Sequence, residues 1–269
     1  MPTEDQGPGW GVASLGLPGN VLQVADDLAD LESVVAVVLG GSRATGAARE
    51  DSDWDLGVYY RSSGGVLDPD DVRNLGYPGQ VSGLGDWGPI VHGGGWLTAG
   101  GTQVDVLFRD LDVVEAWRAN AEQGKFDVLL QAGCLVGAPT YLPVGELACC
   151  LPIHGQLDQP TTFPAQLAAT AAPVWRGQAA VALMFARGYA TIGDTTCCAG
   201  MLSQAVLCEA HARLAEQRRW ALNEKRLITE AGLTAVQPLL AAPGANESTL
   251  ADTIDAIQHI LEIEAADKH

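Results

Sequence analysis

Alternating apolar and polar positions in the first half of the chain predict β-strands joined by glycine-rich turns. Residues 34–39 form an apolar run typical of a buried strand. In residues 53–60 every second side chain is apolar, and the positions between them include Asp53 and Asp55. Segments 95–99 and 102–109 flank Gly100-Gly101, a pair typical of a two-residue hairpin turn. With helices expected to begin at Asn20 and at Asp110, this half predicts an arrangement of helices and strands.

The second half has a different pattern, because strand signals largely disappear beyond residue 124 and long segments rich in alanine and leucine follow. Helices are expected at 144–150, 195–217, 223–237 and 248–266, together with a pair of helices between residues 164 and 189 that Pro173 interrupts. We therefore expect two domains. The first is 1–124, with a loose Gly- and Pro-rich arm at its start, and the second is the helical part, 125–269.

Composition narrows the class of partner. Fifteen Lys plus Arg against 33 Asp plus Glu give a net charge of -18, which repels the backbone of a long nucleic acid and attracts cationic small molecules. An acidic surface that serves solubility is the alternative interpretation. The sequence shows neither a secretory leader nor an uninterrupted apolar span of about 18 residues. We therefore expect a soluble, cytoplasmic protein with no membrane partner.

The candidate functional residues lie in the turn after the first predicted strand and on two later strands. Small side chains at Gly41 and Ser42 let backbone N–H groups approach a phosphate. Asp53 and Asp55 are alternate residues of one strand, so both carboxylates lie on the face opposite its apolar side chains. Asp105 has the same relation to the apolar residues of the second hairpin strand, although a one-residue slip in register would turn it away. Paired carboxylates of this kind hold divalent metal ions such as magnesium.

This order of motifs resembles the DNA polymerase beta-like nucleotidyltransferase superfamily over roughly residues 34–109. The resemblance implies an α+β fold, in which a small mixed-sheet nucleotidyltransferase domain is followed by an α-helical bundle domain. It implies that Asp53 and Asp55 bind magnesium with a nucleoside triphosphate, most often ATP, and that Gly41 and Ser42 contact its distal phosphates. Asp105 is then a third metal ligand or the general base.

Three further residues are candidates for supporting roles. Arg43 follows the turn, and Lys225 lies in a segment, 220–227, that resembles the C-terminal bundles of antibiotic adenylyltransferases. Either cation could reach the triphosphate, and a solvated surface charge is the alternative for both. Glu209 lies in a segment that is apolar on most sides, where burial would raise its pKa and prepare it as a general base. Asp105 and Glu209 therefore compete for that role.

The expected function is magnesium-dependent transfer of a nucleoside monophosphate, AMP first, from a triphosphate to a hydroxyl of a small acceptor, with release of pyrophosphate. The net charge favours a cationic acceptor such as an aminoglycoside, which suggests antibiotic resistance. A long nucleic acid is disfavoured as a partner for the same reason. Two alternatives stay open, a nucleotide-binding regulatory or antitoxin-like module without turnover and an enzyme that nucleotidylates a protein hydroxyl.

Overall fold

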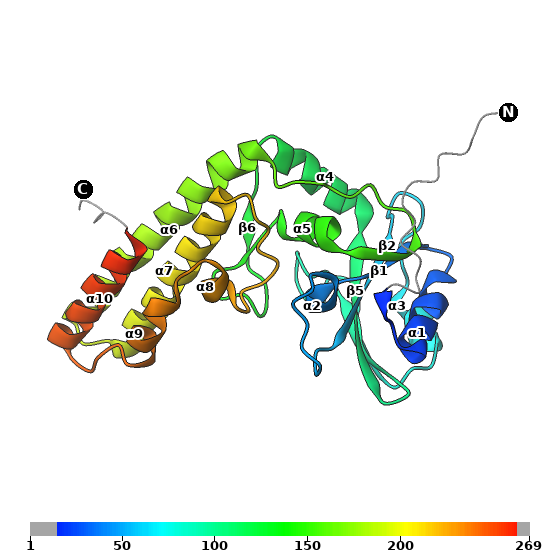
Figure 1. The fold of residues 1–269 in the computed structure, drawn as a ribbon, viewed down its shortest axis with the longest axis horizontal. Coiled ribbons are helices and arrows are strands. Elements are labelled where there is room, and N and C mark those ends of the chain that lie inside the picture. The colour runs from blue at the N-terminus through cyan, green and yellow to red at the C-terminus, as the bar shows by residue number, and fades with distance from the viewer. Residues whose placement is uncertain (1–14, 263–269) are drawn as a thin grey trace. The chain divides into compact units, whose positions relative to one another are not determined.

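The computed structural model describes residues 15–262 (Figure 1), so most of the N-terminal arm expected over residues 1–19 lies outside the described residues. The chain forms two compact units. The first comprises Met1–Val113 with Cys149–Gln159, and the second comprises Val114–Ala148 with Pro160–His269. A mixed sheet in the first unit and helices in the second confirm the expected α+β class. Whether residues 1–124 and 125–269 each fold as a domain is a property of the isolated segments. The predicted boundary at residue 124 therefore stays a prediction.

The first unit is built on a six-stranded sheet in the order β3-β4-β5-β2-β1-β8. The strands are β1 (Val34–Leu39), β2 (Trp54–Tyr60), β3 (Gly79–Val81), β4 (Gly94–Ala99), β5 (Thr102–Asp110) and β8 (Leu151–Gly155). Strands β2 and β5 run parallel, and the other paired strands run antiparallel. The sheet is therefore mixed, as the resemblance implies. Two short helices, α2 (Gly41–Ala44) and α3 (Pro69–Asn74), follow β1 and β2.

Helix α1 (Gly19–Ala29) packs on one face of this sheet. It buries apolar side chains spaced three and four residues apart, as a helix with one apolar face requires. These are Val21, Val24, Ala25 and Leu28. The central strands β2 and β5 contribute five fully buried side chains to the same core, namely Leu56, Val58, Val104, Val106 and Phe108. Because side chains alternate along a strand, the residues between them, Asp55 and Asp105 included, project from the opposite face.

Strand β8 is a correction to the expectation that strand patterns largely disappear beyond residue 124. It pairs antiparallel with β1 at the edge of the sheet and contributes Ile153 to the core of the first unit. Its five residues include Pro152, which an edge strand tolerates because one side of it forms no ladder. A strand this short has too few alternations to be recognised from its pattern.

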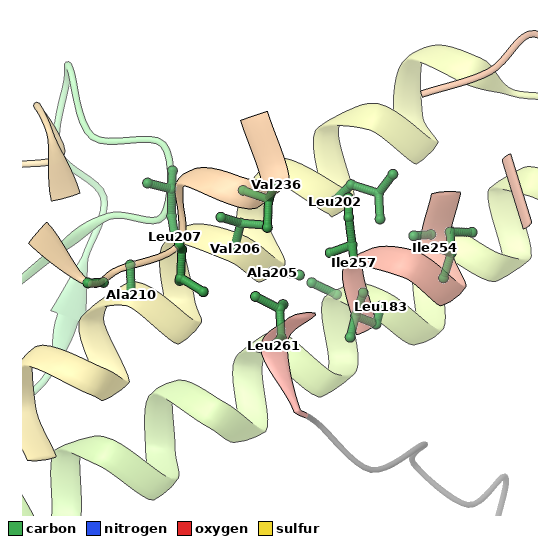
Figure 2. Packing of buried hydrophobic residues seen from close by; sticks show 14 of the residues in the cluster. Leu183, Leu202, Ala205, Val206, Leu207, Ala210, Val236, Ile254, Ile257 and Leu261 are labelled. Carbon is green, nitrogen blue, oxygen red and sulfur yellow. The ribbon is translucent and has the colours of Figure 1, made fainter. Parts of the chain in front are cut away.

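The second unit is mainly helical. Its elements are α4 (Leu111–Glu122, which begins in the first unit), β6 (Val128–Leu129), β7 (Ala138–Pro139), α5 (Leu142–Cys149), α6 (Ala165–Thr191), α7 (Thr195–Glu216), α8 (Leu227–Glu230), the 3-10 helix η2 (Thr234–Val236), α9 (Gln237–Ala241) and α10 (Glu247–Leu261). Helices α6 and α7 run side by side (Figure 1). Figure 2 shows Leu202 of α7 and Ile257 of α10 gathered beside Leu183 of α6 in the buried core. No helix within residues 15–262 is long and apolar enough to cross a membrane.

Two helix predictions in this unit are wrong. Pro173 lies inside one continuous helix, α6, instead of separating two helices. A proline removes one backbone hydrogen bond, and the burial of one side of a 27-residue helix outweighs that loss. The helix expected at 223–237 is replaced by a turn, α8, η2 and α9. Gly232, with φ of +71°, lies just beyond α8 and directs the chain out of the helix.

Candidate active site

The glycine-serine turn lies directly against Asp55 of β2. The main-chain N–H of Gly40 donates to the main-chain oxygen of Asp55 at 2.8 Å. Gly41 has φ of +60°, and a Cβ at this position would overlap the carboxylate of Asp55. Glycine alone suits both the left-handed backbone and the space. Ser42 follows as the second residue of α2, so the turn and its backbone run beside a carboxylate.

Asp55 and Asp105 are brought together by the sheet. They are paired neighbours on the parallel strands β2 and β5. Paired residues of adjacent strands project from the same face, and adjacent strands lie about 4.8 Å apart. Both aspartates are half-buried, whereas Asp53 is exposed and lies one residue before β2. The register thus places Asp105 on the same face as Asp55.

The fit of these residues to a divalent metal rests on their chemistry and on the turn beside them. Carboxylate oxygens are the hard ligands that magnesium prefers, and magnesium usually completes its shell with water and substrate phosphates. Within the described residues, no three Asp, Glu, His or Cys side chains form a ready metal cluster. The roles of Asp53, Asp55 and Asp105 as metal ligands therefore stay predictions.

Arg43 ties the turn to the loop that precedes β2. Its Nε donates to the main-chain oxygen of Asp53 at 3.1 Å, and its Nη2 donates to that of Ser52 at 2.5 Å. Its guanidinium carbon lies 3.9 Å from the ring centroid of Trp54, a cation–π contact. These contacts fix the main chain at Asp53 and occupy two of the guanidinium donor nitrogens. The phosphate contact expected of Arg43 stays a prediction.

Glu209 lies in the second unit, within a cluster of charges between α6 and α7. Its side chain is 2% exposed, Oε1 accepts from Arg213 Nε at 3.1 Å, and Oε2 lies 3.4 Å from Arg176 Nε. Burial raises the pKa of Glu209, and the two guanidinium groups oppose that rise. Arg176 also pairs with Glu216 at 2.6 Å. Both carboxylate oxygens of Glu209 thus face guanidinium groups.

Lys225, also in the second unit, is exposed in the turn that precedes α8. The adjacent Glu224 accepts hydrogen bonds from the main-chain N–H groups of Leu135 and Val136 at 2.8 and 2.9 Å, which fastens this turn to another loop of the same unit. Lys225 itself therefore stands on a fixed turn instead of the expected helix. Its contact with the triphosphate stays a prediction.

An aromatic pair beside the aspartates was not among the residues expected from the sequence. Trp96 of β4 is the antiparallel partner of Asp105 and is 51% exposed. Its ring is stacked on that of Trp87, with centroids 4.6 Å apart and planes 29° apart. The hairpin turn could have predicted this position from the sequence. The two-residue Gly100-Gly101 loop pairs Ala99 with Thr102, so three residues further from the turn Trp96 is paired with Asp105.

Comparison with known proteins gives one family match and a structural similarity. Residues 21–80 match the family model described as a nucleotidyltransferase domain. This range includes the glycine-serine turn, Asp55 of β2 and Asp53, which precedes β2. No curated protein matches the sequence. Among solved structures, the chain is similar to a nucleotidyltransferase-like protein from Exiguobacterium sibiricum 255-15, with 11% identity and a TM-score of 0.46 over 90% of this chain and 73% of that one. Over residues 21–80, the chain is thus similar to a nucleotidyltransferase domain.

Proposed function

We propose that this protein transfers a nucleoside monophosphate, AMP first, from a nucleoside triphosphate to a hydroxyl of a small cationic acceptor such as an aminoglycoside, in a magnesium-dependent reaction that releases pyrophosphate. The nucleotidyltransferase domain supports nucleotide transfer in general. The observation that carries the finer proposal is the contact of Gly41 with Asp55, because Asp55 is in turn paired with Asp105. Phosphate-binding backbone and paired carboxylates then lie on three consecutive strands, β1, β2 and β5.

Each residue has a role in this reaction that follows from its place. The backbone at Gly41 and Ser42 contacts the distal phosphates, which leave as pyrophosphate. Asp53 and Asp55 would hold magnesium, which would supply charge neutralisation and alignment of the triphosphate when bound. Phosphoryl transfer depends mainly on such positioning and charge stabilisation, so no serine or cysteine nucleophile is needed.

Asp105 is our choice for the group that accepts the proton of the acceptor hydroxyl. A general base must come within hydrogen-bonding distance of the hydroxyl, directly or through one water molecule. Asp105 is half-buried on the face that carries Asp55, whereas Glu209 is 2% exposed and both of its oxygens face guanidinium groups. We therefore assign Glu209 a structural role between α6 and α7.

A pyrophosphate-release screen tests the proposal. The protein is incubated with magnesium, each common triphosphate, and a panel of aminoglycosides, lincosamides and other polyols. Calorimetric binding of a triphosphate without pyrophosphate release would favour the regulatory or antitoxin-like module. A protein that gains the mass of one nucleotide would instead identify a protein acceptor.

Replacing Asp53 by Asn should abolish magnesium-dependent turnover, because the amide loses the charge that binds the metal. Asp51→Asn is the matched control. Asp51 lies two residues away in the same loop, with its side chain 72% exposed and paired only with Arg49 among the ion pairs of the described residues. This control should keep nearly all activity. Full turnover by the Asp53 variant would exclude the assignment.

A further inference from the structure

We propose that Trp96, supported by Trp87, forms the subsite on which the cationic acceptor stacks. This inference rests on the proposed function and adds the location and chemistry of acceptor binding. It assigns the tryptophan pair to the acceptor and not to the base of the nucleotide.

Four features form one row across the face of the sheet. The glycine-serine turn ends β1 and contacts Asp55 of β2, Asp55 is paired with Asp105 of β5, and Asp105 is paired with Trp96 of β4. These strands are consecutive in the sheet. With strands about 4.8 Å apart, Trp96 lies about 10 Å from Asp55 along the row. The aspartates thus separate the turn from the tryptophan.

This order identifies what Trp96 faces. In phosphoryl transfer the attacking and leaving oxygens lie roughly in line, on opposite sides of the phosphorus. The leaving pyrophosphate is held at the turn, and the reacting phosphorus lies beside Asp55 and Asp105. The acceptor hydroxyl must then approach from the side away from the turn, which is the side of Trp96.

The chemistry of the pair suits a cation. The face of a tryptophan ring attracts a positive charge, and the attraction is larger for tryptophan than for other aromatic side chains. Asp105 lies beside Trp96 in the sheet, and the exposed Asp86 precedes Trp87 in the chain. An amino sugar gains from both the ring face and the carboxylates, whereas an uncharged nucleobase gains from stacking alone.

The fold holds this pair in place. Trp87 lies over Gly94 of β4, where a Cβ would press against its ring. The loop between β3 and β4 is closed by a bond from Ser82 N to Gly94 O at 2.8 Å and by one from Gly94 N to Ser82 Oγ at 2.9 Å. Trp87 is thereby fixed behind Trp96, and half of the surface of Trp96 stays available to a ligand.

Calorimetric titration of Trp96→Ala and Trp96→Phe tests the inference. Each protein is titrated with α,β-methylene ATP and magnesium, and the resulting complex is titrated with the panel compound that releases most pyrophosphate, or with kanamycin where none does. Trp96→Ala should weaken acceptor binding about tenfold and leave nucleotide binding within about twofold. Trp96→Phe should restore most of the loss, since an aromatic face remains. Phe185→Ala, an exposed aromatic of α6, should change neither.

The outcomes are distinct. Weaker nucleotide binding with unchanged acceptor binding would assign Trp96 to the nucleobase and overturn the inference, as would no change in either affinity. If the wild-type protein releases no pyrophosphate with any compound, the proposed function fails, and kanamycin binding still decides about the subsite. Binding that depends on Trp96 then supports it, and absence of binding overturns it.

Discussion

At Gly41 the backbone has φ of +60°, and a Cβ added there would overlap the carboxylate of Asp55. Gly46, five residues later, has φ of +70°, and a Cβ there would meet nothing within 4 Å. Alanine at either position adopts a strained backbone, which costs on the order of 1 kcal/mol. Only at Gly41 must a carboxylate also move. The two glycines therefore separate backbone strain from displacement of Asp55.

We expect Gly41→Ala to lower kcat of the proposed transfer by about 100-fold, because a shift of about 1 Å in a reacting geometry has an effect of that size. Gly46→Ala should lower kcat by less than about threefold. Gly46→Ala should lower the free energy of unfolding by about 1 kcal/mol, measured by urea denaturation, and Gly41→Ala should lower it by more because Asp55 must also move. Equal losses of kcat in the two variants would show that the contact with Asp55 is irrelevant to catalysis.

At the scale of elements, the contact of α6 with α7 contains a buried imidazole. His211 of α7 is 3% exposed, and its ring is stacked on that of Trp175 of α6, with centroids 4.4 Å and planes 15° apart. Neither ring nitrogen has a hydrogen-bond partner among the described residues. Burial lowers the pKa of His211 from 6.5 to about 4. This pair of helices therefore holds a neutral imidazole that resists protonation.

The direction of the pH effect follows from that lowered pKa. Between pH 6.5 and pH 4 the unfolded chain binds a proton at His211 and the folded chain does not, so stability is complete above pH 6.5 and falls as the pH decreases. From pH 7 to pH 4.5 His211 should cost about 2 kcal/mol of the free energy of unfolding. His211→Phe keeps an aromatic ring against Trp175 and should remove this loss.

Urea denaturation at pH 7 and pH 4.5 measures the effect. Other groups also titrate in this range, so the informative quantity is the difference between variant and wild type. His259→Gln, at an exposed position of α10, is the control and should keep the wild-type acid sensitivity. An equal loss on acidification in His211→Phe and in the wild type would show that the buried imidazole does not contribute.

At the scale of the whole molecule, the two units have separate apolar cores. Ile153 of β8 belongs to the core between α1 and the sheet, and Ile257 of α10 belongs to one of the two cores of the helical unit. Each side chain is almost completely buried. Truncating either one to alanine removes packing within its own core, at a cost of about 2 to 4 kcal/mol.

We expect Ile153→Ala to increase hydrogen–deuterium exchange at the amides of β1 and β2, because β8 lies beside β1 and its loss makes β1 an edge strand. Ile257→Ala should increase exchange in α7 and α10 and serves as the reciprocal control. Exchange that rises equally in both units for either variant would contradict the presence of separate apolar cores in each unit.

Local patterns predicted much of the sheet. The boundaries of β1, β2, β4 and β5 lie within one residue of the expected ones, because alternation and a two-residue glycine turn act over a few neighbouring residues. The helices α1, α7 and α10 were expected for the same reason. The helix over 223–237 and the break at Pro173 were wrong, since propensity is a weak influence where tertiary packing opposes it.

The sequence by itself determined the turn at Gly41-Ser42, the strand that presents Asp55, and the face of β5 that carries Asp105, because these depend on steric and alternation rules within short segments. Tertiary structure alone decided that β2 lies beside β5, that β8 joins β1 and that Glu209 faces Arg176. These arrangements depend on burial shared between segments far apart in the chain, for which no local pattern carries a signal.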